Sequence, residues 1–177
     1  MKFYNIYSAI DNEAACADLK QSDIGIDDFI IYDEGSYQEE AIFIAQEGYT
    51  LKNISQTDFI KTVPNMLLFS ENFVNKLSKN LENELNFFPA KLRVQNEELK
   101  CFLGKIKLSA PLVDFKKSSF YEIDGEKFID YPPVFLEDIQ GFEYCAKEDS
   151  DDLIWIFTEK FKDLVLANDL KIEFLPV

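Results

Sequence analysis

Carboxylates are the only side chains in this sequence whose number suggests chemistry. The 177 residues include 33 Asp and Glu, 18 Lys and Arg, and no histidine. The absence of histidine excludes Ser–His and Cys–His nucleophile pairs, imidazole acid–base catalysis and zinc sites that need an imidazole. Carboxylate pairs such as Asp27-Asp28 and Glu39-Glu40 could still serve glycoside or metal-assisted hydrolysis, but such pairs are expected by chance among 33 acids. We therefore expect a binding protein rather than an enzyme, and a carboxylate-based hydrolase remains an alternative.

Motifs for cofactors and metals are missing. The six glycines are scattered singly, so there is no phosphate-binding loop, and no Gly-x-Ser-x-Gly motif is present. Cys16, Cys101 and Cys145 form no Cys-x-x-Cys pair, and they are expected to be reduced and mostly buried in a cytoplasmic protein. The acidic run 148–152 lacks the loop glycine and the later Glu of an EF-hand, so we expect a solvated loop there. The sequence predicts no cofactor and no metal.

The net charge of -15 limits the possible partners. Arg93 is the single arginine, and a strongly acidic protein repels phosphate, so neither a nucleic acid nor an anionic membrane is an expected partner. A basic protein fits best, because complementary charge speeds association, although acidity can also serve solubility alone. Residues 1–60 contain 12 acids and 3 bases, so a third of the chain carries most of the excess.

The acidic excess lies mainly between Asp11 and Glu47, where Lys20 is the only cation. Tyrosines lie in the same stretch. On many protein-binding surfaces a tyrosine ring anchors the partner and the surrounding charges orient it. The predicted partner-binding residues are Asp23, Asp27, Asp28, Tyr32, Asp33, Glu34, Tyr37, Glu39 and Glu40.

The pattern of apolar residues predicts an α+β fold with a mixed or mainly antiparallel sheet, in a single domain over 1–177. Residues 1–60 are a possible acidic lobe. No apolar run is long enough for a membrane span, and residues 1–5 do not begin a signal peptide. We expect two main helices, at about 71–84 and 159–168, which Ser70 and Thr158 cap. Strands are expected at 2–7, 29–32, 41–45, 153–156 and 172–174, a helical turn within 11–21, and hairpins at 92–108 and, through Asp124-Gly125, at 120–129.

The two predicted helices lie in segments of similar sequence. Residues 68–73, Leu-Phe-Ser-Glu-Asn-Phe, resemble residues 156–161, Ile-Phe-Thr-Glu-Lys-Phe, and each helix leads to an aromatic strand that ends in proline. The chain is therefore expected to contain two strand–helix–strand units with the same capping chemistry.

Residues 66–177 resemble a family of bacterial polymorphic-toxin immunity proteins that is typed by a myxobacterial member. The resemblance rests on Leu-Phe-Ser-Glu-Asn-Phe (68–73), Phe-Phe-Pro-Ala-Lys-Leu (87–92), Val-Asp-Phe-Lys-Lys-Ser (113–118) and Trp-Ile-Phe-Thr-Glu-Lys-Phe (155–161). It implies a protein that binds and neutralises a toxin in the cytoplasm, and it supplies no catalytic residues. Asp114 and Ser118 match the shared segment, and we expect them to cap a turn.

The resemblance implies as the partner a cognate toxin encoded nearby, and the acidity favours a basic one, such as a nuclease, whose substrate cleft carboxylates can occupy. The alternative is an acidic scaffold or nucleic-acid mimic that binds a host DNA-binding protein. The sequence leaves the oligomeric state open, and a homodimer is possible.

Overall fold

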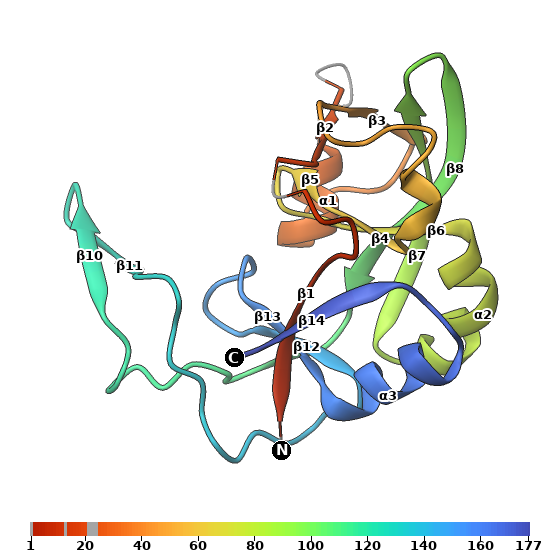
Figure 1. The fold of residues 1–177 in the computed structure, drawn as a ribbon. Helices are drawn as coiled ribbons and strands as arrows, with labels where there is room; N and C mark the ends of the chain where they lie inside the picture. Colours follow the sequence, from red (N-terminus) through yellow and green to blue (C-terminus); the bar gives the residue numbers. More distant parts are fainter. Residues whose placement is uncertain (1, 13, 21–24) are drawn as a thin grey trace.

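The computed structural model describes residues 2–12, 14–20 and 25–177, which form an α+β fold with mixed sheets (Figure 1). Three α-helices lie in this part of the chain: α1 (Ile26–Tyr32), α2 (Glu71–Leu81) and α3 (Glu159–Ala167). A single turn of 3-10 helix, η1 (Ile54–Gln56), lies between α1 and α2. None of the helices in the described ranges is long and apolar enough to cross a membrane.

The larger sheet has seven strands and curls almost into a barrel. Only Lys61 separates the strands at its two ends, β4 and β5, so the chain itself connects the two edges. The order of its strands is β4 (Phe59–Ile60), β6 (Leu67–Ser70), β8 (Glu97–Ile106), β7 (Leu85–Val94), β3 (Ala41–Ala45), β2 (Ala17–Leu19) and β5 (Thr62–Val63).

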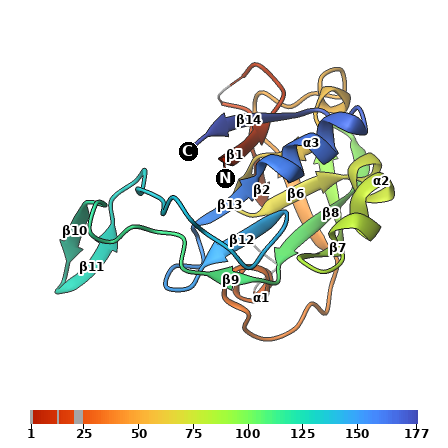
Figure 2. The same cartoon turned by 90° about the horizontal axis from the view of Figure 1, so that it is seen from below.

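The second sheet has five strands and contains the N-terminal and C-terminal strands side by side (Figure 1). Its order is β14 (Ile172–Pro176), β1 (Phe3–Ser8), β13 (Trp155–Thr158), β12 (Cys145–Glu148) and β9 (Ser109–Ala110). A separate two-stranded sheet, β10 (Phe120–Ile123) and β11 (Glu126–Ile129), extends away from the body of the protein in both views (Figures 1 and 2).

The strand predicted at 29–32 is wrong, because these residues belong to α1. Ile26, Ile30 and Ile31 lie on one buried face of this helix, and a short apolar run does not distinguish a buried strand from a buried helix. The expectation of two main helices therefore missed a third. Within 11–21, where a helical turn was expected, Ala17–Leu19 form strand β2, and residues 13 and 21 lie outside the described part of the chain.

The two main helices are close to their predicted positions, and both predicted caps are present. α2 ends at Leu81 instead of residue 84, and α3 ends at Ala167 instead of residue 168. Ser70 Oγ accepts a hydrogen bond from the Phe73 amide at 3.0 Å, and Thr158 Oγ1 accepts one from the Phe161 amide at 3.3 Å. These bonds satisfy amides that the first helical turn leaves free.

Both strand–helix–strand units have the same topology. In the first, β6 and β7 flank β8, and in the second, β13 and β14 flank β1; every pairing is antiparallel. The register also agrees. Equivalent rows across the three strands are Phe69–Phe102–Pro89 in the first unit and Phe157–Tyr4–Pro176 in the second.

The central strands of the two units come from different parts of the chain. β8 follows β7 through a tight hairpin, whereas β1 comes from the N-terminus and pairs with the last strand, β14. β1 thus occupies in the second unit the position that β8 has in the first. Residues 1–60 contribute strands to both large sheets, because β1 lies in one and β2 and β3 in the other.

The helices of the two units meet in a common apolar core. The Phe73 and Phe161 ring centroids are 6.2 Å apart, and both rings are fully buried. Each ring also packs against the last aromatic residue of the preceding strand. The ring centroids of Phe69 and Phe73 are 4.2 Å apart, and those of Phe157 and Phe161 are 4.5 Å apart. Equivalent positions of the two units therefore pack against each other.

Buried carboxylates connect these units to the segments around them. Asp58 accepts hydrogen bonds from the Ser70 hydroxyl, from Asn72 Nδ2 at 3.1 Å and from the Lys171 amide at 2.8 Å. Glu84 accepts them from three successive amides, those of residues 143–145, at 2.6 to 2.9 Å. Asp58 thus holds the second unit against the first, and Glu84 holds the start of β12, which pairs with β13, against the first unit.

Replacing the cap of α2 is expected to destabilise the fold. Ser70→Ala removes both the bond to the Phe73 amide and the hydroxyl that donates to buried Asp58, so we expect a loss of about 1–3 kcal/mol in the free energy of unfolding. Chemical denaturation followed by fluorescence measures this loss. Ser78→Ala, later in the same helix, is the matched control and should change stability by less than about 0.5 kcal/mol. Equal effects of the two substitutions would contradict the capping role.

Candidate partner-binding site

The predicted binding residues lie on α1 and on the loop that leads to β3; we call residues 27–40 the acidic segment. Asp27, Asp28 and Tyr32 belong to α1, and the others follow it, except Asp23, which lies outside the described residues. The segment is continuous, but the structure gives its residues different roles.

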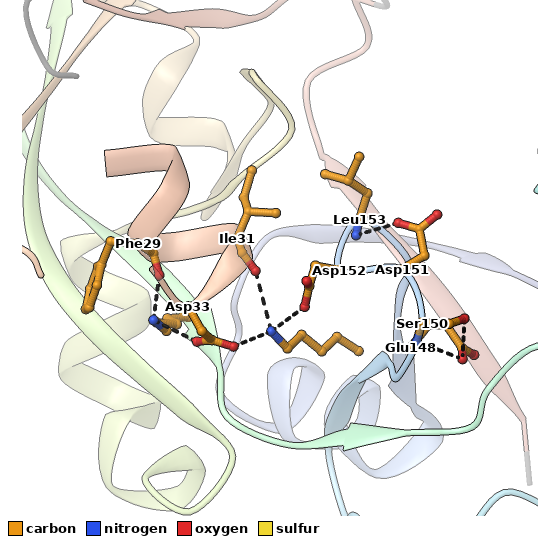
Figure 3. A network of polar contacts seen from close by, with 10 residues as sticks. Phe29, Ile31, Asp33, Glu148, Ser150, Asp151, Asp152 and Leu153 are labelled. Carbon is orange, nitrogen blue, oxygen red and sulfur yellow. Dashed lines mark hydrogen bonds and ion pairs between the residues drawn. The ribbon is translucent and has the colours of Figure 1, made fainter. Parts of the chain in front are cut away.

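Asp33 joins α1 to both large sheets. It follows the last turn of α1 with φ of 60°, and its two carboxylate oxygens pair with Lys105 Nζ of β8 at 2.8 Å and Lys147 Nζ of β12 at 2.6 Å. The same lysines donate hydrogen bonds to carbonyls near the end of the helix. Lys105 Nζ donates to the Phe29 carbonyl at 2.5 Å, and Lys147 Nζ donates to the Ile31 carbonyl at 3.4 Å (Figure 3). Lysines favour a helix C-terminus because the free carbonyls there carry partial negative charge.

Lys147 is the most enclosed charge of this cluster. Its side chain is only 9% exposed, and its ammonium also pairs with Asp152 Oδ1 at 2.5 Å (Figure 3). Burial alone would lower the pKa of Lys147, but hydrogen bonds from Nζ to Asp152 and Asp33 outweigh it and raise the pKa above its ordinary value. Burial alone would likewise raise the pKa of Asp33, and the hydrogen bonds from Lys105 and Lys147 reverse the effect and lower it. Asp33 and Lys147 are therefore both charged at neutral pH.

Tyr37 also has an internal role. Its hydroxyl donates to the Pro89 carbonyl and accepts from the Ala41 amide at 2.9 Å, while its ring lies 5.1 Å from Phe88 and 6.0 Å from Phe29. It thereby packs the acidic segment against β7, where that strand begins to pair with β3. Tyr32, in contrast, is exposed.

The remaining carboxylates of the acidic segment are exposed or partly exposed. Glu40 pairs with Lys91 at 3.4 Å. Asp28, Glu34 and Glu39 are exposed, and no residue in the described ranges pairs with their carboxylates, so each leaves a negative charge at the surface. Asp27 is partly exposed. The structure thus divides the predicted residues into those that hold α1 in place and those that are available to a partner.

The acidic run 148–152 does not converge on a metal. Glu148 turns inward and accepts hydrogen bonds from the Leu112 and Val113 amides at 2.7 and 2.8 Å. Asp151 accepts from the Leu153 amide within its own turn, and Asp152 pairs with Lys147 (Figure 3). Within the part of the chain that the structure describes, no group of three or more His, Cys, Asp and Glu is arranged to hold a metal.

One cavity, of about 530 Å³ beside the N-terminus of α2, contains several carboxylates. Asp58 lies in its wall but already accepts from three donors, and Glu71 pairs with Lys100 at 2.7 Å. General acid–base catalysis needs a carboxyl that is free to exchange a proton with a substrate. Asp58 and Glu71 are thus engaged with other residues of the chain, whereas Asp169, which also lines the cavity, is exposed to solvent.

The three cysteines are free thiols, and Cys101 and Cys145 are buried. Burial, which is the main cause, raises the pKa of both thiols, and neighbouring carboxylates add to the effect. Since the thiolate is the reactive form, these two side chains act as small core residues.

A second exposed feature was not predicted as a site. We call residues 119–131 the arm; it consists of β10, β11 and the residues at either end of them. Its hairpin turn agrees with the prediction, because Asp124 and Gly125 have φ of 53° and 86°, as a type I′ turn requires. Large apolar side chains of the arm are nevertheless exposed: Phe120, Tyr121, Ile123, Phe128 and Tyr131. The adjacent aromatic residues in Phe120-Tyr121 were the available signal, since consecutive apolar residues cannot share one buried face of a strand.

No protein-family model, curated protein or solved structure matches this chain. The resemblance of residues 66–177 to toxin-immunity proteins therefore stays a prediction.

The Asp33 cluster predicts a defined pH dependence. Asp33→Asn removes a carboxylate whose pKa is lowered by folding, so its contribution is present above the unfolded pKa of about 3.9 and lost as the pH falls through the folded value. At pH 7 we expect a loss of about 1 kcal/mol, because half of the Asp33 side chain is exposed and solvent screens the pairs. The difference in the free energy of unfolding between wild type and variant, measured from denaturation curves at pH 7, 5 and 3, should be equal at pH 7 and 5 and smaller at pH 3.

The matched control is Glu34→Gln, at the next residue. It removes an exposed carboxylate without an ion pair in the described ranges, so stability should change by less than about 0.5 kcal/mol at each pH. If the difference in the free energy of unfolding between wild type and Asp33→Asn stays constant down to pH 3, the ion pairs assigned to Asp33 are contradicted.

Proposed function

We propose that this protein is an immunity protein that binds a cognate basic bacterial toxin domain in the cytoplasm and blocks it sterically and electrostatically. It performs no reaction of its own. The toxin class that suits it best is a nuclease, because a nuclease holds a polyanion in a basic cleft that carboxylates can occupy.

The observation that carries this proposal is negative charge that the fold does not neutralise. In the described part of the chain nine carboxylates form ion pairs, and Asp58, Glu84 and Glu148 are buried against hydrogen-bond donors. Exposed acids such as Asp28, Glu34 and Glu39 have no such structural task. Charges of this kind repel one another within the folded protein, and a basic partner relieves that repulsion on binding.

Direct measurement with the toxin encoded beside this protein is the decisive experiment. The purified proteins should form a complex that abolishes toxicity on co-expression, and the association rate should fall by about 10-fold or more between 50 and 500 mM NaCl. No binding to that toxin, or binding to a housekeeping DNA-binding protein instead, would overturn the proposal in favour of the nucleic-acid mimic.

Charge reversal in the acidic segment predicts a kinetic effect. The triple variant Asp28→Lys, Glu34→Lys, Glu39→Lys should slow association with the toxin by about 10-fold at 50 mM NaCl, with a smaller change in the dissociation rate. Its free energy of unfolding should stay within about 1 kcal/mol of wild type, because the replaced side chains are exposed and the main cost is a lysine in the first turn of α1.

A control variant with the same change in net charge separates a local patch from overall charge. Glu82→Lys, Asp163→Lys, Glu173→Lys alters exposed acids that follow or lie on α2, α3 and β14. This variant should slow association by less than about 3-fold. If both triple variants slow association equally, the acidic segment has no special part in recognition.

A further inference from the structure

We infer that the arm is the element that docks into the partner, by inserting its exposed rings and carboxylates into a concave, basic surface of the toxin. This inference rests on the proposed function and names the contact surface within it. Figures 1 and 2 show the arm extending away from the two large sheets, so a partner can approach both of its faces.

The side chains of the arm are arranged for contact with another molecule. Tyr121 stands opposite Phe128 in the antiparallel register, with ring centroids 5.5 Å apart, and Ile123 is on the same face. Tyr121, Ile123 and Phe128 are 49%, 55% and 39% exposed, so the stacked pair and its neighbour form an apolar face open to solvent. On the opposite face Phe120 stacks on Phe115 at 6.1 Å. Exposed aromatic residues of this kind are typical anchors of protein interfaces.

The charge of the arm indicates what kind of partner it accepts. Residues 120–131 contain four acids and one lysine in the sequence. Glu122, Asp124 and Asp130 are exposed beside the rings. Two copies of this arm placed face to face would bring like charges together, which disfavours self-association. A basic partner surface neutralises these carboxylates while its apolar parts cover the rings.

The base of the arm is built to hold it in one position. Buried Glu148 fixes the Leu112 and Val113 amides, and Val113 forms a β-bridge with Phe135 on the returning chain. Beyond that bridge, the Asp114 amide donates to the Val134 carbonyl at 2.7 Å, and Asp114 caps the turn through the Lys116 amide at 3.0 Å.

Further hydrogen bonds continue to the start of the hairpin. Ser118 Oγ accepts from the Val134 amide at 3.0 Å, and the Asp130 amide donates to the Ser119 carbonyl at 2.9 Å. An isolated two-stranded hairpin is only marginally stable in water. The series of bonds at its base therefore orders the arm before binding, which lowers the entropic cost of association.

The test measures binding and inhibition of the toxin encoded beside this protein. Tyr121→Ala, Phe128→Ala removes the stacked pair, and we expect a loss of affinity of about 30-fold or more. Glu122→Gln, Asp124→Asn removes two charges but keeps the turn, since Asn-Gly suits a type I′ turn as well as Asp-Gly. We expect this second variant to slow association by about 3- to 10-fold at 50 mM NaCl, and by less at 500 mM.

The control is Leu51→Ala, Leu166→Ala, which removes exposed apolar side chains outside the arm and should leave affinity within about 2-fold of wild type. Fluorescence of the single tryptophan, Trp155 in β13, reports whether each variant is folded. If the aromatic variant does not fold, the charge variant, which conserves the turn, decides the question through its association rate.

The possible outcomes separate this inference from the proposed function. If wild type binds the toxin and the arm variants bind equally well, the arm is not the docking element although the immunity function holds. If wild type does not bind the toxin, the proposed function fails and the inference fails with it. If sedimentation shows a wild-type dimer that the Tyr121→Ala, Phe128→Ala variant does not form, a second copy occupies the arm and the inference is overturned.

Discussion

Hydrogen bonds from donors of distant segments to buried carboxylates hold the parts of this protein in place. A carboxylate inside a protein is costly unless its lone pairs are satisfied, and removing one partner leaves that cost uncompensated. Asp58, Glu84 and Glu148 each accept hydrogen bonds from several donors, many of them backbone amides, and these bonds offset the cost of burial. Asp58 connects the second strand–helix–strand unit to the first, Glu84 connects the first unit to the start of β12, and Glu148 fixes the base of the arm. The arrangement of the units, the sheets and the arm therefore depends on these three buried acids and not on acids at the surface.

Acidic residues thus have separate roles that net charge alone does not distinguish. Some are internal acceptors, and Asp33 belongs to an ion-pair cluster that attaches α1 to Lys105 and Lys147. Others, such as Asp28 and Glu39, remain as uncompensated charge at the surface. The excess of acids over bases comes from the internal acceptors and from the exposed acids, because neither group has cationic partners, whereas the Asp33 cluster contains its own cations.

Local signals in the sequence predicted the local elements of the fold. The Ser70 and Thr158 caps, the two helices that follow them and the Asp124-Gly125 turn depend on residues a few positions apart, so their chemistry could be read directly. The strand predicted at 29–32 failed because α1 has a buried face of only three residues. The pairing of β1 with β14 and the nearly closed seven-stranded sheet depend on contacts between distant segments, for which the sequence contains no local signal.

The candidate site was predictable to the same extent. Composition located the acidic segment, but it could not show that Asp33 and Tyr37 are engaged internally, because their partners Lys105, Lys147 and Pro89 are 50 or more residues away. The turn of the arm was evident from sequence, whereas its exposure was not. Whether a hairpin packs on a sheet or extends into solvent is decided by the segments at its base.

The position of β1 has a consequence for how the chain acquires its structure during synthesis. β1 is made before the other strands described here, whereas its neighbours in the sheet, β13 and β14, are made about 150 residues later. The first unit has its own central strand, β8, directly after β7, so it can assemble while translation continues. The second unit must wait until β13 and β14 have been made, and β1 keeps its apolar face without a partner until then.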